Sequence, residues 1–452
     1  MRAVDRRILG LAVPALGALV AEPLFLATDT ALVGHLGVDP LAALGIASTV
    51  LQTAIGLLVF LAYATTPAVA RLLGAGDRAA AVRAGVDGIW LALALGLVLA
   101  IVGPFVAHPL AAAFGASDEV TDLAALYLAI SSAGIPAMLA VIAATGLFRG
   151  LQDTRTPLVI AVAGFAANAA LNALLIYGAG WGIAGSAIGT VLAQWGMAVA
   201  CIAIAIRHAR REHAGIRPGL PGVASAARAG GWMLLRTVTL RVALVATTVA
   251  ATGLGTVTLA STQVLFQVTF LFALALDAFA IAAQAMIGFD LGAGSHAQVR
   301  ATVRRLLLWG VGSGVAFGAI LAVAAPWLGH VFSSDAGVVD AVPAGAFVVA
   351  ATMPLGAVVF VLDGVLIGAN DGRYLAVAGA VNLVVYLPLL WWAAQTTAGP
   401  TQAVLGIQLA YCIGFYGIRA LTLGVRVIGS RWMEVGPGSA RLDPDATGSE
   451  RG

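Results

Sequence analysis

Twelve apolar runs of roughly 20 or more residues constrain this chain more than any other feature of its sequence. A helix needs about 20 apolar residues to cross the hydrocarbon core of a bilayer, where only helices and closed barrels satisfy their backbone hydrogen bonds. Of the 452 residues, 61% are hydrophobic and 10% are charged, which excludes a water-soluble globular fold. We therefore predict an all-α integral membrane protein with twelve transmembrane helices. The expected spans are 9–34, 42–70, 84–107, 121–147, 157–178, 183–206, 229–252, 257–288, 303–328, 338–367, 374–396 and 402–425.

Arginine is concentrated in the even-numbered connections between these spans. The odd-numbered connections carry acids instead, among them Asp39, Glu119 and Asp335. Because arginine-rich connections remain in the cytoplasm, we predict a multi-pass protein of the cell membrane with both termini cytoplasmic. The net charge of +3 is too small to predict binding to nucleic acid.

The chain also repeats itself at a constant offset in the numbering. Leu73–Gly76 matches Leu291–Gly294, an offset of 218 (291 − 73), and matches at this offset continue through most of each half. Each half holds six spans, so the halves enter the membrane from the same side as a parallel repeat, and such bundles enclose a central cavity. We predict two pseudo-symmetric six-helix bundles, which favours a transporter. The expected domains are lobes at 1–206 and 223–428, a cytoplasmic linker at 207–222 and a disordered cytoplasmic tail at 429–452.

Asp29 is a carboxylate inside the first apolar run. A charged aspartate at the bilayer centre costs on the order of 2.5–3.5 kcal/mol even on lenient insertion scales, so an acid there is a functional candidate by default. Burial disfavours the charged form, and we expect Asp29 to exchange protons near neutral pH. Glu22 lies seven residues earlier, close to two helical turns, and therefore shares its face. Glu22 either tunes Asp29, contacts substrate, or is solvated near the outer side of the helix.

Charged and polar residues also interrupt the second half. Counted from the cytoplasmic helix ends, Arg241 and Asp277 reach a similar depth, so we predict a structural ion pair between them. Gln284 is a candidate for the wall of the cavity, with a role in substrate contact or tuning. Asp87 and Asp363 lie near cytoplasmic ends and are expected to be solvated or paired with arginines.

Four stretches resemble the multidrug and toxic compound extrusion (MATE) family, and its DinF-like branch in particular. The first is DTALVGHLG, which begins at Asp29 and follows Pro14 and Pro23. The others are GLFRGLQDTRTP, LRTVTLRVAL and ALDAFAIAAQAMIGFDLGAG, which begin at residues 146, 235 and 275. The resemblance covers nearly the whole chain and implies an exporter of organic compounds, often cationic and amphiphilic, driven by entry of protons or sodium.

The resemblance also implies a cation-coupling site in the first half. Asp29 matches the family's first-helix acid, Asn168 its polar residue in the fifth helix, and Thr190 its threonine in the sixth. Asn172 departs from the pattern, because several members, including sodium-binding ones, carry a second carboxylate there. Asn168 and Asn172 share a helix face, so both amides are expected to hydrogen-bond Asp29; alternatively, they only join helices of the bundle.

We predict a secondary active antiporter that exports organic, cationic amphiphilic compounds in exchange for protons, with protonation of Asp29 as its switch. Sodium coupling is the first alternative, although one carboxylate provides a weaker site for sodium than two. A flippase for lipid-linked saccharides is the second, if Arg236 and Arg241 face the central cavity. An enzyme is not expected, because the chain carries no nucleophile or metal-binding motif. We expect a monomer in the lipid bilayer that handles small organic molecules, with no metal and no cofactor besides the coupling ion.

Overall fold

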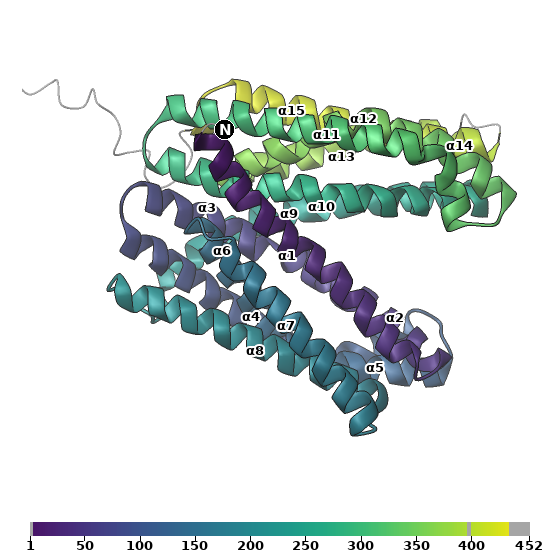
Figure 1. Cartoon of the computed structure of the whole chain (residues 1–452), viewed down its shortest axis with the longest axis horizontal. Coiled ribbons are helices and arrows are strands. Elements are labelled where there is room, and N and C mark those ends of the chain that lie inside the picture. The colour runs from purple at the N-terminus through teal and green to yellow at the C-terminus, as the bar shows by residue number, and fades with distance from the viewer. Residues whose placement is uncertain (1–2, 396–398, 434–452) are drawn as a thin grey trace, which may run out of the picture. The chain divides into compact units, whose positions relative to one another are not determined.

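The computed structural model describes residues 3–395 and 399–433, and these are almost entirely helical (Figure 1). Within these residues, eleven helical segments are long and apolar enough to cross a membrane. The helices α5 and α6, bent by 53° at a short break, make a twelfth when they are counted as one span. The predicted all-α membrane fold is therefore confirmed, and the predicted twelve spans agree with this count.

The helices follow one another through short connections. In the first half they are α1 (Ala3–Gly34), α2 (Val38–Leu58), α3 (Phe60–Gly74), α4 (Arg78–Ala112), α5 (Asp118–Ser132), α6 (Ile135–Gly150), α7 (Arg155–Ala173), the π-helical turn η1 (Leu174–Gly178) and α8 (Gly182–Arg211). In the second half they are α9 (Leu220–Gly253), α10 (Thr256–Gly292), α11 (His296–Phe332), α12 (Ala336–Gly368), α13 (Gly372–Gln395), α14 (Pro400–Leu409), the π-helical turn η2 (Ala410–Phe415), α15 (Tyr416–Ile428) and the 3₁₀ turn η3 (Arg431–Met433).

The described residues form two compact units. The first unit is Val13–Gly230, and the second unit combines Met1–Ala12 with Gly231–Gly452. The start of α1 therefore belongs to the second unit, and the start of α9 belongs to the first. The lobe bounds predicted from the sequence, 1–206 and 223–428, remain a prediction, and much of the expected linker is helical. Trp432, in the expected tail, is buried, whereas residues 434–452 lie outside the described part.

Charged side chains hold the starting ends of α1 and α9 in their units. In the second unit, Nη1 of Arg7 lies 3.0 Å from Oδ1 of Asp290, and Asp5 accepts a hydrogen bond from the indole of Trp309 at 3.2 Å. In the first unit, the backbone N–H of Gly219 donates to Oδ1 of Asp87 at 2.8 Å. Asp87 also pairs with Arg83. Pairing with an arginine is one of the two alternatives that the sequence left open for Asp87.

The turns of the two halves repeat the same backbone geometry. Gly76 and Gly294, which the repeat places opposite each other, both have positive φ, 84° and 72°. Gln152 and Asn370, related by the same offset, have φ of 66° and 61°, which non-glycine residues rarely adopt. Equivalent connections therefore close in the same way.

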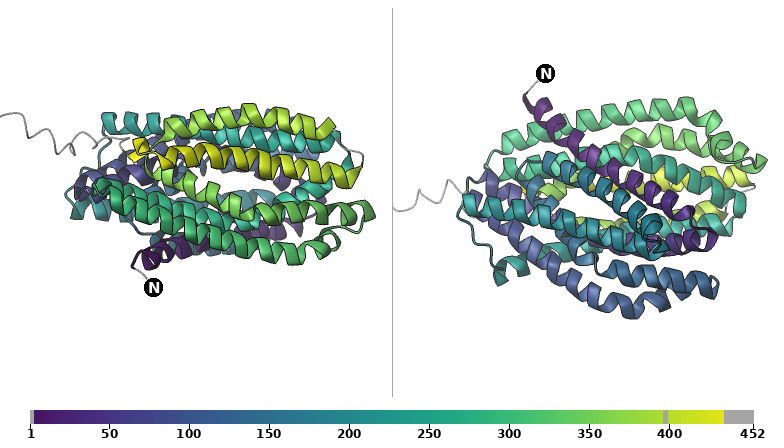
Figure 2. Two further views of the ribbon diagram at one scale, coloured as in Figure 1. Left: turned by 90° about the horizontal axis from the view of Figure 1, so that it is seen from above. Right: turned by 60° about the horizontal axis from the view of Figure 1, so that its bottom comes forward.

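Two GxxxG motifs allow close contacts between helices. A methyl group on Gly146 of α6 would lie 3.1 Å from the Cα of Ala62, and one on Gly364 of α12 would lie 2.7 Å from the Cα of Ala280. The repeat relates both the glycines and their partners, since 364 − 146 and 280 − 62 give the same offset. Small residues let membrane helices approach closely, so the repeat preserves this contact. In both views of Figure 2, α11 and α12 also run side by side.

Candidate functional site

Asp29 lies on α1 within the first unit and is 5% exposed. Its Oδ1 accepts hydrogen bonds from Nδ2 of Asn172 at 2.7 Å and from Oγ of Ser186 at 2.8 Å. Its Oδ2 accepts a longer hydrogen bond, 3.4 Å, from the hydroxyl of Tyr127. Three helices, α5, α7 and α8, therefore supply the donors that solvate this carboxylate.

The polar residues of α7 and α8 form two matched pairs, one helical turn apart. Asn168 and Asn172 share one face of α7, and Ser186 and Thr190 share one face of α8, because each pair is four residues apart. The side-chain amide of Asn168 donates to Oγ1 of Thr190 at 3.0 Å, and Nδ2 of Asn172 also lies 3.2 Å from Oδ1 of Asn168. All four residues are buried, so these contacts fix the network.

Gly189 leaves the space that the Asn172 amide occupies. A methyl group on Gly189 would lie 2.1 Å from Oδ1 of Asn172, so the absence of a side chain there provides the space that the amide occupies. Directly after α7 the chain forms η1, in which the hydroxyl of Tyr177 donates to the carbonyl of Leu32 on α1. Such π-helical turns are frequent at functional sites. Here η1 attaches the end of α7 to α1, one turn beyond Asp29.

A cavity of about 90 Å³ opens beside this network. Asp29, Tyr127, Asn168 and Thr190 line it together with Glu22, and the rest of the wall is largely apolar. A buried water needs about 10–15 Å³, so the cavity has room for several. The carboxylate is thus buried among donors but borders a space large enough to hold water.

The structure brings Asp29, Asn168, Asn172 and Thr190 together, as the sequence predicted. Asn172 hydrogen-bonds Asp29, as expected. The expected hydrogen bond from Asn168 is wrong, because the Asn168 amide donates to Thr190 and reaches Asp29 only through Asn172. Their role in coupling remains a prediction. Sequence reasoning missed Ser186 and Tyr127. Ser186 could have been found, because it lies one turn before Thr190 on the same face, but nothing near Tyr127 in the sequence marks it.

The equivalent position in the second unit carries no acid. The repeat places Thr247 opposite Asp29 and Tyr386 opposite Asn168, since 247 − 29 and 386 − 168 both give 218. Their hydroxyl groups lie 2.6 Å apart, and both residues are fully buried. The second unit therefore keeps a polar contact at this place, but two hydroxyl groups make it and no carboxylate takes part.

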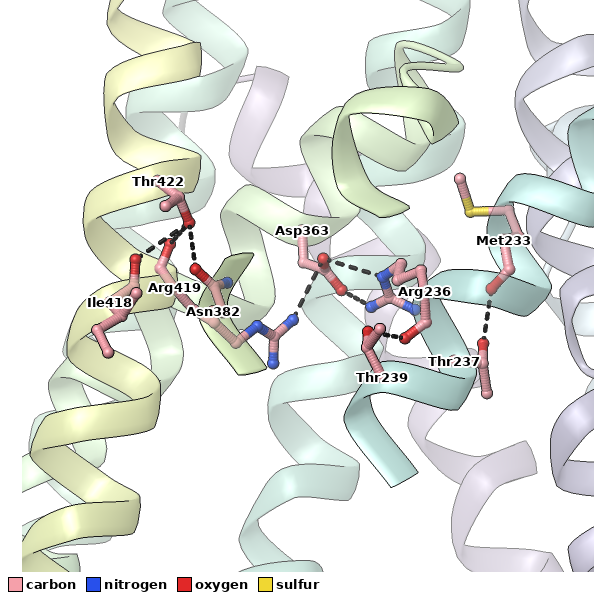
Figure 3. A network of polar contacts seen from close by, with 9 residues as sticks. All are labelled: Met233, Arg236, Thr237, Thr239, Asp363, Asn382, Ile418, Arg419 and Thr422. Carbon is pink, nitrogen blue, oxygen red and sulfur yellow. Dashed lines mark hydrogen bonds and ion pairs between the residues drawn. The ribbon is translucent and has the colours of Figure 1, made fainter. Parts of the chain in front are cut away.

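A different charged cluster lies inside the second unit (Figure 3). Asp363 of α12 accepts hydrogen bonds from Nε and Nη2 of Arg236 on α9, the former at 3.2 Å, and lies 3.3 Å from Nη2 of Arg419 on α15. All three residues are at most 9% exposed. Asp363 is thus paired with arginines, one of the two outcomes expected for it. Breaking such a buried pair typically costs about 3–5 kcal/mol, so the cluster joins α9, α12 and α15.

The other candidates of the second half lie apart from the Asp29 network. Arg241 is exposed on α9 and Asp277 is half-buried on α10, and the ion pair between them remains a prediction. Gln284 is 1% exposed, and its backbone lies against Gly368, so its expected contact with substrate also stays a prediction.

The chain has two repeated halves of six spans, and one of them holds a buried carboxylate beside a cavity. This is the plan of a secondary membrane transporter. The MatE family model matches residues 14–174 and again residues 233–392, once in each half. The chain belongs to this family, the MATE transporters, so the resemblance seen in the sequence is confirmed. The family is one of transporters and not of enzymes.

Relatives of the chain cover most of its length. It is 30% identical to Protein DETOXIFICATION 44, chloroplastic, of Arabidopsis thaliana, over 95% of this chain and 83% of that protein. It is 29% identical to a probable multidrug resistance protein NorM of Bradyrhizobium diazoefficiens, over 94% and 93% of the two chains. DNA damage-inducible protein F of Escherichia coli is 28% identical over 65% of each chain, in agreement with the predicted DinF-like branch.

Solved structures show the same fold. The Vibrio cholerae MATE transporter VcmN in its bent form has a TM-score of 0.84 and 21% identity, over 94% of this chain and 98% of that one. A MOP superfamily transporter from Pyrococcus furiosus has a TM-score of 0.83 and 20% identity, over 96% and 97%.

We predict that Gly189→Ala impairs transport without unfolding the protein. The added methyl group would displace the Asn172 amide, and losing a hydrogen bond to a charged group costs about 1.5–3 kcal/mol. Gradient-driven efflux of a cationic dye from proteoliposomes should fall about tenfold or more. The matched control is Gly196→Ala on the same helix, where no atom lies within 4 Å of the added carbon. Equal efflux by the two variants would show that the position of Asn172 does not matter.

Proposed function

We propose that this protein is a proton-coupled antiporter that exports organic, cationic amphiphilic compounds across the cell membrane. In this proposal it works as a monomer with both termini in the cytoplasm. The observation that carries the proposal is the surroundings of Asp29, a buried carboxylate on a cavity wall with three hydrogen-bond donors around it.

The two oxygens of Asp29 differ in their surroundings, and this supports a proton exchange at one of them. Oδ1 accepts two short hydrogen bonds, whereas Oδ2 has only the 3.4 Å contact with Tyr127. A proton is therefore most easily accommodated on Oδ2, where it displaces the weakest interaction. Protonation removes the negative charge, so the site loses its attraction for a cation in the same cavity. Re-ionisation restores that attraction, which links proton movement to release and rebinding of the substrate.

The donor set favours protons over sodium. Sodium, like other hard cations, needs several oxygen ligands. The groups that contact Asp29 here are donors, and Asn172 turns its nitrogen toward the carboxylate. With an amide at position 172, the network holds one acid. Sodium coupling remains the alternative, and the gradients described below separate the two.

The similarity to the NorM and DETOXIFICATION proteins supports export of diverse organic molecules, since the former is named a probable multidrug resistance protein. The alternative of a lipid-linked saccharide flippase depended on arginines facing a central cavity. Arg236 binds Asp363 within the second unit, so it is engaged in a buried pair. This pairing favours the exporter.

Asp29→Asn should abolish proton-driven efflux. The amide keeps the size of the side chain but cannot exchange a proton, so we expect efflux at background level. The measurement is efflux of a cationic dye from proteoliposomes under separately imposed proton and sodium gradients. In the wild type, the proton gradient alone should drive efflux. Efflux driven by sodium alone would refute proton coupling, and normal efflux by Asp29→Asn would refute the mechanism.

Asn172→Asp should add a response to sodium. A second carboxylate beside Asp29 supplies the additional charge and oxygen that a sodium site needs, and two adjacent carboxylates favour a bound cation. In the same proteoliposomes, a sodium gradient should then drive efflux at least about threefold above the wild-type level. Asn172→Ala, which removes the amide without adding charge, should show no sodium response. Absence of a sodium response in Asn172→Asp would mean that position 172 does not select the ion.

A further inference from the structure

The first unit contains a second cavity, of about 130 Å³, that shares part of its wall with the cavity beside Asp29. The shared residues are Glu22 of α1, Met138 of α6, Phe165 of α7 and Met197 of α8. The second cavity extends along apolar side chains of α6 and α7 and has Glu22 as its only charged lining residue. Glu22 therefore lies where the cavity beside Asp29 and the second cavity adjoin.

Glu22 has a carboxylate that is available to a ligand. Its side chain is exposed, and it has no ion-pair or hydrogen-bond partner among residues 3–395 and 399–433. Pro23 follows it inside α1, and proline has no amide hydrogen, so the carbonyl of Leu19 lacks its helical donor one turn earlier. An acid and a backbone acceptor without its helical donor thus lie close together on the same helix.

The wall around Glu22 suits a large lipophilic cation. The rings of Phe25 and Phe165 stack with centroids 4.9 Å apart, and both line the cavity beside Asp29. Aromatic faces attract cations, and methionine side chains such as Met138 and Met197 adapt to ligands of different shape. A carboxylate with an aromatic pair and methionines provides charge, polarisable surface and adaptability together.

We propose that Glu22 is the counter-ion of the transported substrate and selects lipophilic cations over neutral molecules of the same size. The positive centre binds at Glu22, and the apolar body of the substrate extends into the second cavity. Asp29, on the same face of α1, exchanges the proton. Two acids thus have separate tasks: Glu22 sets which substrates bind, and Asp29 couples their movement to protons. This assignment rests on the proposed exporter function.

The test compares binding of a cation and of a neutral relative without any gradient. Tetraphenylphosphonium is the cationic probe and triphenylphosphine oxide the neutral one, each measured at equilibrium on the purified full chain in detergent. Glu22→Gln should weaken binding of tetraphenylphosphonium at least about tenfold and change that of triphenylphosphine oxide less than about twofold. The matched control is Glu119→Gln, which neutralises an exposed acid at the start of α5 and should change neither affinity.

Other results overturn the assignment. Unchanged binding of the cation by Glu22→Gln, even with a shifted pH profile of transport, would make Glu22 a tuning residue of Asp29. An equal loss of affinity for both probes would show that Glu22 determines the shape of the cavity and not its preference for cations. If Glu22→Gln does not fold, Glu22→Asp decides, since it keeps the charge: retained preference for the cation supports the assignment and lost preference refutes it. Because these binding assays use no gradient, their outcome does not depend on proton coupling at Asp29. Failure of the coupling proposal and failure of the Glu22 assignment can therefore be distinguished.

Discussion

The cost of a carboxylate in an apolar environment determines how the first unit is built around Asp29. An ionised acid away from water must be compensated by hydrogen bonds, and no single helix can supply them. Asn172, Ser186 and Tyr127 come from three different helices to do so. Their placement in turn requires close packing, which Gly189 allows beside the Asn172 amide. The position of one charge therefore fixes the approach of α7 and α8 and the small residues between them.

The two units share an architecture but differ in their chemistry. Their turns, GxxxG contacts and helix order repeat at one constant offset, because each unit meets the same packing requirements. Their buried polar groups do not repeat. The first unit holds an acid surrounded by neutral donors, whereas the second pairs Thr247 with Tyr386 and binds Asp363 to Arg236 and Arg419. A carboxylate held by two guanidinium groups is compensated at all times, so the lone acid among neutral donors is the better candidate for a proton switch.

Much of this organisation could be predicted, because it follows from hydrophobicity and spacing. Apolar runs indicate spans, and the four-residue spacing of Asn168 and Asn172 correctly indicated a shared face. The missing parts depend on contacts between distant segments. Tyr127 is 98 residues from Asp29, and no local pattern marks its approach. For Asp363 the sequence left open whether it is solvated or paired and did not indicate its partners, since Arg236 and Arg419 reach it from helices far along the chain. The division of α1 and α9 between the units was equally invisible, because the charged contacts that hold their starting ends join residues far apart in the sequence, such as Arg7 and Asp290.

Proton coupling requires that Asp29 give up a proton when a cationic substrate binds. Infrared difference spectroscopy on the purified protein can observe this directly, because a protonated carboxyl group has its own C=O stretching band. At a pH where Asp29 is protonated, addition of tetraphenylphosphonium should remove such a band in the wild type, and this change should be absent from Asp29→Asn. Proton release from Asp29 is contradicted if substrate changes no protonated carboxyl band in the wild type, or if the same band disappears in Asp29→Asn.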